Sequence, residues 1–297
     1  MNPLIRCMTD DGNFLATAID SGDLVHAAQT IHRTSSVATA ALGRLLTAAA
    51  MMGVMLKEER SSVTVKIDGG GPLGMLTAIA DNRGHCRGSI SHPEVVLPLQ
   101  SNGKLDVGGA VGKTGTLLVI RNQGQGEPYI GQIGLVSGEI AEDVTHYFAV
   151  SEQIPTVCAL GVLVDKTDQK VLLAGGLLVQ ALPGTDDDAL THLEQNLMTL
   201  PSVTTMLAQG LSPEDMCRKA LEGFGVSVLE EYAAQYACPC SHERVKRALC
   251  SMPAAELLEI AQNEGKLEAT CQYCGRQYEI TKSELESLAA IQKNREV

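Results

Sequence analysis

The sequence predicts an α+β protein with three parts: an N-terminal domain of sheet and helices, a helical linker, and a small C-terminal domain organised by cysteines. Short β-branched runs alternate polar and apolar residues between turns rich in Gly and Asp, and helical stripes are grouped apart from them. After Pro183-Gly184 the chain becomes helical and acidic, and four of the nine cysteines then fall into two close pairs. With 297 residues, 44% of them hydrophobic, the chain can bury a sizeable core.

The first domain is expected to span residues 1–183. Helical periodicity covers residues 20–56, where Val37, Leu45 and Met52 belong to one apolar stripe. A second helix is expected over residues 139–153. Alternating β-branched runs bounded by turns predict strands at residues 62–67, 73–80, 115–120, 129–133, 158–164 and 175–180.

The glycine-rich run Gly108–Thr114 resembles a phosphate-binding loop, but its spacing differs. Such a loop has four residues between its first Gly and the Gly-Lys-Thr, whereas Gly108 leaves three before Gly112. A β-rich run follows, so the strand-to-helix context is missing as well. We interpret this run as a glycine-rich segment that leads into a strand, without nucleotide binding.

The predicted linker, residues 184–231, consists of short amphipathic helices. Three aspartates stand at the start of the first helix, and Ser212 with Pro213 predicts a capped start for another. From residue 186 to 231, nine acidic residues face two basic ones, which gives a net charge of −7. Short helices of this kind are marginal alone and depend on docking. The linker is therefore either an ordinary connector or an element that folds only while something holds it.

The two cysteine pairs are the most specific motif. Cys238-Pro239-Cys240 is followed after thirty residues by Cys271-Gln272-Tyr273-Cys274. Two such pairs are typical of a tetrahedral metal site, and four thiolates with no open position suit one structural Zn²⁺ per chain. Two local disulfides are the alternative. A disulfide across two residues is strained and labile, so the first pair can hold zinc when reduced and form an easily reduced bond when oxidised.

The C-terminal domain, residues 232–297, is too short for a self-sufficient core. We expect helices at residues 241–249, 254–263 and 283–292, and strands at 266–270 and 277–281 on either side of the second cysteine pair. About sixty residues can scarcely fold by burial alone. Metal binding should therefore supply most of the folding free energy of this domain.

Composition and motif context argue against several other functions. The net charge of −12, without a basic stripe, argues against a nucleic-acid-binding zinc ribbon. Catalytic zinc keeps a ligand position open, and His242 is better placed as part of a helix start than as a replacement ligand, so we expect no hydrolase. Cys271 and Cys274 lack the βαβ context of a thiol–disulfide oxidoreductase. The protein is therefore expected not to be an enzyme.

The chain is expected to be cytoplasmic and to have no membrane contact. Its start lacks a signal-peptide pattern, and the apolar stretch of residues 38–56 carries Arg44. An odd number of cysteines then indicates a reducing compartment. Five cysteines outside the two pairs are expected to be small core residues, with Cys217 and Cys250 the two to examine for side reactions; they are Cys7, Cys86, Cys158, Cys217 and Cys250.

Both cysteine pairs resemble those of the heat shock protein 33 family, which are redox-regulated bacterial holdase chaperones. The resemblance extends to Tyr147–Thr156, Gly69–Leu73 and Ala174–Gln180, and it covers essentially the whole chain in the same order. It implies an N-terminal domain for client binding and dimerisation, a redox-sensitive linker and a C-terminal zinc switch. It also implies that the reduced protein holds zinc through Cys238, Cys240, Cys271 and Cys274 and is inactive.

The resemblance further implies what oxidation does. Cys238 would pair with Cys240, Cys271 would pair with Cys274, and zinc would be released. The zinc domain and linker would unfold, and the protein would dimerise and bind unfolding client proteins without ATP under oxidative stress. Elementary chemistry agrees, because zinc-bound sulfurs are thiolates, the form that reacts with peroxide or hypochlorous acid. An uncovered linker stripe would then offer apolar surface to clients.

Overall fold

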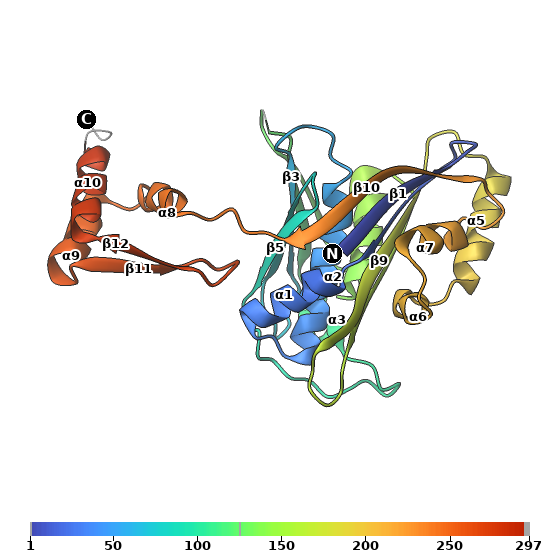
Figure 1. Ribbon diagram of the computed structural model, residues 1–297, viewed down its shortest axis with the longest axis horizontal. Helices are drawn as coiled ribbons and strands as arrows, with labels where there is room; N and C mark the ends of the chain where they lie inside the picture. Colours follow the sequence, from blue (N-terminus) through green and yellow to red (C-terminus); the bar gives the residue numbers. More distant parts are fainter. Residues whose placement is uncertain (1, 125, 294–297) are drawn as a thin grey trace. The chain divides into compact units, whose positions relative to one another are not determined.

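The computed structural model describes residues 2–124 and 126–293, which form two compact units that meet in sequence between Ala237 and Cys238. Residues 1, 125 and 294–297, which the predicted domains include, lie outside the described residues. Figure 1 shows the elements of both units. The predicted α+β class is confirmed.

One ten-stranded sheet is the basis of the first unit, with the strand order β7-β6-β3-β4-β5-β10-β1-β2-β9-β8. Neighbouring strands are antiparallel except β5 and β10, which pair in parallel at Gln235 and Tyr236. The strands are β1 (Asn2–Thr9), β2 (Phe14–Asp20), β3 (Ser62–Asp68), β4 (Leu76–Asp81), β5 (His85–Ile90), β6 (Thr116–Asn122), β7 (Tyr129–Gly134), β8 (Thr156–Val164), β9 (Val171–Ala181) and β10 (Val226–Tyr236). β10, the last of them in sequence, thus lies inside the sheet between β5 and β1.

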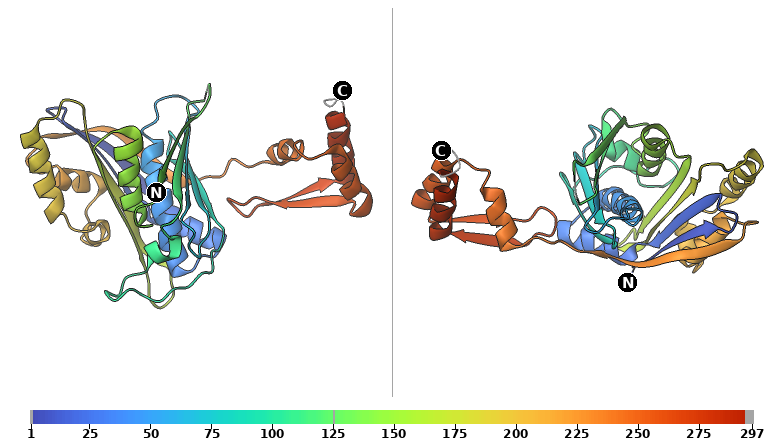
Figure 2. Two further views of the ribbon diagram at one scale, coloured as in Figure 1. Left: turned by 180° about the vertical axis from the view of Figure 1, so that it is seen from behind. Right: turned by 90° about the horizontal axis from the view of Figure 1, so that it is seen from above.

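The inner face of the sheet curves around α2 (Ser36–Gly53), as Figure 2 shows. α2 is long and apolar enough to cross a membrane by length and composition, yet 89% of that window is buried, so α2 is the central core helix. It packs against β4, β5, β8 and β9. The helices beside it are α1 (Gly22–His32), α3 (Val107–Val111), α4 (Ile140–Tyr147) and the π-helix η1 (Phe148–Glu152).

Three helices cover the opposite face of β1, β2 and β9 (Figure 1): α5 (Asp187–Thr199), α6 (Val203–Ala208) and α7 (Pro213–Ala220). We call these the linker helices. Residues alternate along each strand, so Leu178 of β9 points to the core around α2 whereas Leu177 and Val179 point to the linker helices. We call the sheet surface under these helices the covered face; its buried members are Cys7, Phe14, Ala16, Ala18, Leu177, Val179 and Ala181.

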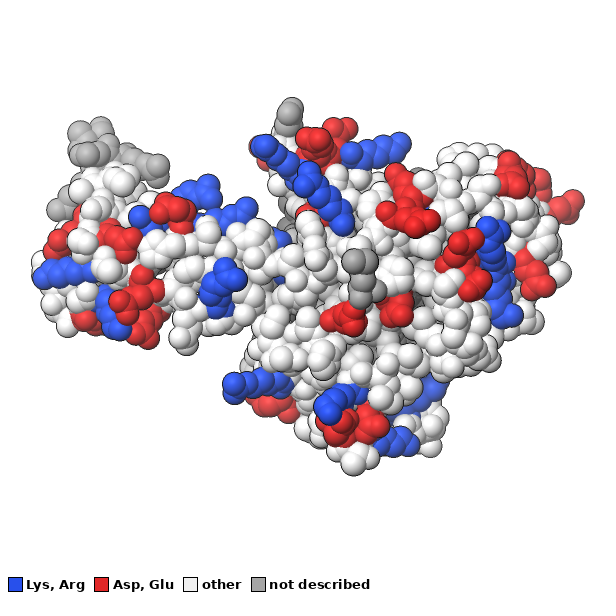
Figure 3. Space-filling view, viewed as in Figure 1, with Lys and Arg blue, Asp and Glu red and all other residues white. Residues whose placement is uncertain are grey.

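Charged side chains on the linker helices point to solvent. Asp186, Asp187 and Asp188 are exposed at the start of α5, where the Asp186 carboxylate accepts a hydrogen bond from the Ala189 N–H at 2.7 Å. Ser212 and Asp215 form a reciprocal capping box at α7, with Pro213 as the first helical residue. Both helix starts confirm the predictions. On the face in Figure 3, Lys and Arg are interspersed with Asp and Glu instead of forming one basic stripe.

Two predicted helices are interrupted in the structure. The helix expected over residues 20–56 is two helices, because Arg33 adopts a left-handed conformation (φ 51°) and Ser35 then caps α2 through the Ala38 N–H. The helix expected over residues 139–153 is α4 followed by η1, and it ends where Gln153 is left-handed (φ 57°). A left-handed residue cannot continue a right-handed helix, so each marks a boundary.

The glycine-rich run leads into a strand, β6, as interpreted, but a short helix that was not expected precedes that strand. Its residues Val107–Val111 form α3, because the Asp106 carboxylate accepts a hydrogen bond from the Gly109 N–H at 3.0 Å. β6 then follows, so the order is helix to strand, the reverse of a phosphate-binding loop. Gly71 is required beside α3, since a Cβ there would lie 2.4 Å from the Val111 carbonyl carbon.

The six predicted strands correspond to β3, β4, β6, β7, β8 and β9, but β4 begins three residues later than expected. Strands β1, β2, β5 and β10 were not predicted. β10 corrects the helical character expected for the end of the linker, because residues 226–231 are extended and pair with β1. The boundaries proposed at residues 183 and 231 stay predictions about which parts fold independently.

Over residues 238–293, the second unit holds a β-hairpin and three helices. The hairpin strands β11 (Lys266–Thr270) and β12 (Gln277–Thr281) coincide with the predicted strands, as does α9 (Ala254–Asn263) with its predicted helix. α8 (His242–Leu249) and α10 (Lys282–Lys293) lie within one residue of their predicted bounds. The buried apolar core of the second unit is one small cluster, which consists of Ala254, Leu257, Ala261, Ile280, Leu285, Leu288 and Ala289.

Candidate metal centre

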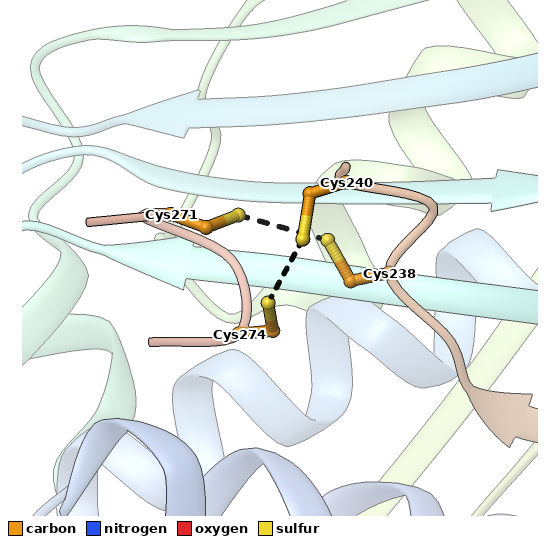
Figure 4. Close-up of side chains that lie close together, drawn as sticks. All are labelled: Cys238, Cys240, Cys271 and Cys274. Atoms are coloured by element: carbon orange, nitrogen blue, oxygen red, sulfur yellow. Dashed lines mark hydrogen bonds between the residues drawn. The ribbon is translucent and has the colours of Figure 1, made fainter. Parts of the chain in front are cut away.

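The structure brings the four paired cysteines together (Figure 4). Cys238 and Cys240 lie between β10 and α8, and Cys271 and Cys274 lie in the turn between β11 and β12. All four sulfur atoms are within 4.8 Å of one another. The Sγ atoms of Cys238 and Cys271 are 3.7 Å apart, and those of Cys240 and Cys274 are 3.3 Å apart. Each of these two contacts thus joins a cysteine of the first pair to a cysteine of the second pair.

A tight turn aims the second pair at the first. The Cys271 N–H donates to the Arg276 carbonyl at 2.9 Å, and the Gly275 N–H donates to the Cys271 carbonyl at 2.9 Å. Gly275 has φ 69°, the left-handed region that favours glycine. Glycine directly after Cys274 therefore lets the chain turn back into β12 while both sulfurs stay on the same side.

The local environment shifts the pKa values of Cys238 and Cys240 in opposite directions. Burial raises the pKa of Cys238 to about 12. Burial acts in the same direction at Cys240, but hydrogen bonds from the Tyr278 hydroxyl and from the other three thiols outweigh it and lower the pKa of Cys240 to about 7. The Tyr278 Oη lies 3.0 Å from the Cys240 Sγ. Cys240 is thus the thiol that ionises most readily, and the thiolate is the form that binds metal and attacks oxidants.

His242 is engaged elsewhere. Its Nε2 lies 2.8 Å from the Glu284 Oε1, and Ser241 before it caps α8 by accepting a hydrogen bond from the Arg244 N–H. A backbone hydrogen bond from Thr281, followed by the contact with His242, lowers the pKa of Glu284 to about 2. His242 thus serves to join α8 to the start of α10, in agreement with the expectation that it does not replace a cysteine.

The four sulfurs fit a zinc ion. Tetrahedral coordination with Zn–S bonds of about 2.3 Å places ligand sulfurs about 3.8 Å apart. The separations of 3.7 and 3.3 Å are close to that value, and all four sulfurs lie within 4.8 Å of one another. Among the described residues, this is the only group of His, Cys, Asp and Glu side chains placed to hold a metal ion. Four soft donors and no carboxylate favour zinc over magnesium or calcium.

Comparison with known proteins supplies the family. The model of the family described as Hsp33 protein matches residues 2–281. The chain belongs to the Hsp33 family. Its fold and its cysteine cluster agree with that membership, and the resemblance derived from the sequence is confirmed.

Individual relatives cover nearly the whole chain. A 33 kDa chaperonin of Geobacillus kaustophilus is 42% identical over 290 residues, which are 98% of each chain. A 33 kDa chaperonin of Agathobacter rectalis is 44% identical over 285 residues, 96% of this chain and 98% of the relative. The crystal structure of the 33 kDa chaperonin of Thermotoga maritima superposes with a TM-score of 0.89 at 35% identity, covering 99% of both chains.

The remaining cysteines are distributed mostly as expected. Cys7, Cys86, Cys158 and Cys217 are buried, and burial raises the pKa of Cys158 to about 12. Cys250 is only half-buried at the end of α8, but it packs against the apolar core of the second unit, so its expected place at the core is confirmed in part. The sequence did not indicate that Cys7 of β1 and Cys217 of α7 lie in contact, because nothing in the local pattern of either residue refers to the other.

Proposed function

We propose that this chain is a redox-regulated, ATP-independent holdase chaperone whose switch is the four-cysteine cluster. The observation that carries the proposal is the convergence of two half-exposed cysteine pairs in a unit with a very small apolar core. Membership of the Hsp33 family, whose relatives are named chaperonins, supports the chaperone role. A cytoplasmic location, no nucleic acid, no membrane contact and no catalysis belong to the same proposal.

In the reduced state, Cys238, Cys240, Cys271 and Cys274 would hold one Zn²⁺ per chain as thiolates. When bound, the ion would supply cross-links that the small apolar cluster cannot, with a binding free energy on the order of 10 kcal/mol. Seven buried apolar residues are few for a sixty-residue unit, since domains of this size bury too little surface to be stable alone. The fold of residues 238–293 would thus depend on the four thiolates.

Oxidation would remove the donors in pairs. All four sulfurs are thiolates in the zinc-bound form; if the attack comes from the first pair, the Cys240 sulfur takes an oxygen from the peroxide to give a sulfenic acid and, with one proton, one water. The Cys238 thiol then displaces a second water, so that one disulfide forms and the peroxide gains two electrons. A second peroxide would pair Cys271 with Cys274 in the same way. Either disulfide leaves two donors at most, which is too few for a closed zinc site.

Unfolding of the second unit would destabilise the linker helices through β10. This strand runs up to Tyr236, and the Ala237 N–H still donates to the Cys86 carbonyl at 2.8 Å, so the cysteines begin where the sheet pairing ends. Among β10 residues only Ala234 is buried, so the strand is held more by backbone pairing than by side-chain burial. Unfolding that starts at Cys238 can therefore propagate into β10 and the linker helices, which are short and dock on few residues.

Undocking of the linker helices would create the client-binding surface. Phe14, Leu177 and Val179 of the covered face, with Leu193 and Met216 of the helices, are buried against one another. Exposed together they form a contiguous apolar patch of the kind that binds unfolded chains. A second copy of the oxidised chain would meet the same patch, which supports the proposed homodimer in that state.

Simultaneous measurement of zinc release and chaperone activity tests this function. Reduced, zinc-loaded protein is treated with peroxide under mild heat, zinc is followed with a chromogenic chelator, and aggregation of a chemically denatured client is followed by light scattering. We expect zinc release to precede suppression of aggregation in the same samples. Equal suppression by the reduced protein would refute the switch, and suppression without zinc release would refute its link to the cluster.

A further inference from the structure

Cys7 lies on the covered face of β1, next to small neighbours. Leu4 of β1 faces the core around α2, whereas Ile5 and Cys7 face the linker helices. Cys7 pairs in register with Ala16 of β2 and with Val228 of β10. The pairing between β1 and β10 shifts between Arg6 and Cys7, a bulge of the kind that re-aims side chains. Cys7 is fully buried, and so is the small residue Ala16 beside it.

Cys217 points down onto the same place from α7. The buried residues of α7 are Pro213, Met216, Cys217 and Ala220, one face of a helix at three- and four-residue spacing. α7 packs directly against β1 and β2. Cys217 is fully buried in the same apolar cluster as Cys7, so the two thiols lie in one dry layer between α7 and β1. Among the five cysteines outside the metal cluster, Cys7 and Cys217 are the two that share one buried cluster across a helix–sheet interface and influence each other's pKa.

We propose that Cys7 and Cys217 form a second redox site, a disulfide that fixes α7 to β1. The contact distinguishes the two sulfurs. The hydrogen bond from Cys217 lowers the pKa of Cys7, and the same contact, followed by burial, raises the pKa of Cys217. Cys7 is therefore the nucleophile and Cys217 the thiol that resolves the intermediate.

The oxidant is a small disulfide, written RSSR. The Cys7 thiolate attacks one sulfur of RSSR, which forms a mixed disulfide and releases RS⁻. The Cys217 sulfur then attacks the Cys7 sulfur, gives up its proton and releases the second RS⁻. Two protein thiols have become one disulfide, one RSSR has become two RSH, and two electrons have passed to the small molecule.

Burial controls when this site reacts. Neither thiol is exposed while α7 is docked, whereas all four cluster cysteines are half-exposed. An eight-residue helix docked through four residues opens locally far more often than the core unfolds. The cluster therefore reacts first, and the Cys7–Cys217 site reacts as α7 begins to leave the sheet. Closed, the disulfide holds α7 on the covered face and limits how far the linker opens, a consequence that rests on the proposed function.

Peptide mapping of the wild-type protein tests the site without any chaperone assay. Full-length, reduced, zinc-loaded protein is incubated with oxidised glutathione at a temperature where amides of residues 213–220 exchange measurably, then alkylated, digested and mapped without reduction. We expect a peptide pair joined through Cys7 and Cys217, formed after the cluster pairs oxidise. Two free thiols, or two separate glutathione adducts, would overturn the proposal.

Two variants measure what the disulfide does. Cys217→Ala removes the site, and Cys86→Ala is the matched control, a fully buried sheet cysteine in contact with the Gly84 carbonyl. After oxidation, amides of residues 213–220 should exchange more slowly in wild type and Cys86→Ala than in Cys217→Ala, by a factor on the order of 30 or more. Equal exchange rates of these amides in all three proteins would overturn the proposal that the disulfide fixes α7 to β1. If the Cys7–Cys217 disulfide forms but oxidation never induces client binding, the proposed function is refuted while the second redox site is supported.

Discussion

The two units of this protein reach a folded state by different means. Sixteen of the eighteen residues of α2 are buried at the centre of the first unit, whereas α8 of the second unit has no buried residue. Apolar burial on that scale stabilises the first unit by itself. The second unit brings four sulfurs together and has a buried apolar cluster of only seven described residues. On the proposed function, one chain thus combines a domain held by its apolar core with one whose folding depends on the oxidation state of its four cysteines.

The largest expected effect comes from removing one ligand. Cys271→Ser should abolish stoichiometric zinc binding and unfold residues 238–293, because structural zinc contributes on the order of 10 kcal/mol. The first unit should keep its secondary structure. Zinc content by atomic absorption and far-ultraviolet circular dichroism measure both effects. Cys250→Ser, a half-buried cysteine of the same unit outside the cluster, is the control and should retain zinc; full retention by Cys271→Ser would reject the ligand assignment.

A core substitution in each unit should act differently. Leu45 and Leu285 are both fully buried. Leu45→Ala should lower the free energy of unfolding of the first unit by about 2–5 kcal/mol, with or without zinc. Leu285→Ala should instead weaken the apparent zinc affinity, since folding and metal binding of the second unit are coupled. Denaturant titration measures the free energy of unfolding, and competition with a chelator measures the zinc affinity. An unchanged zinc affinity in Leu285→Ala would contradict the coupling of folding to metal binding in the second unit.

A smaller effect is expected from helix caps. Ser212→Ala removes the capping box of α7 and should destabilise that helix by about 1 kcal/mol. α7 would then undock more often, and the variant should become active at a lower peroxide dose. Ser241→Ala, which removes the cap of α8, is the counterpart in the second unit and should speed zinc loss without loosening α7. Identical exchange of residues 213–220 in both variants would contradict this division.

The smallest effect concerns pH and has opposite signs in the two units. Burial raises the pKa of Asp143, so its contribution to stability is present below its ordinary value and is lost as pH rises through the raised pKa. Hydrogen bonding lowers the pKa of Glu284 to about 2, so its contribution is present above about pH 4.5 and is lost as pH falls toward 2. Thermal unfolding is measured between pH 3 and 7. Asp143→Asn should reduce the loss of stability of the first unit as pH rises, and Glu284→Gln should reduce the loss of stability of the second unit as pH falls. A pH dependence of the unfolding temperature that is the same in each variant as in the wild type would contradict both expectations.

The second unit could be predicted well from the sequence because its signals are local. The alternation in residues 266–270 and 277–281 and the helical period in residues 254–263 set element bounds without reference to distant parts of the chain. Paired cysteines likewise identify one another by their spacing, which is why the cluster was expected before the structure was known.

The first unit was harder because several of its elements are defined by distant partners. β1 has buried residues on both faces, since Leu4 faces the core and Cys7 faces the linker helices, so its sequence lacks simple alternation. β10 contains Glu230 and Glu231 and a bulge, and it is extended because β1 pairs with it across more than two hundred residues. The contact between Cys7 and Cys217 arises in the same way, from packing of α7 on β1.

Hydrogen exchange of the full chain, zinc-loaded and after peroxide, tests most directly whether the cluster controls the cover over the sheet. If the cluster controls the docking of the linker helices, amides in residues 242–292 and in those helices should lose protection from exchange on oxidation. Amides of α2 should stay protected. Protection of residues 187–220 that is unchanged after complete zinc release would contradict that control.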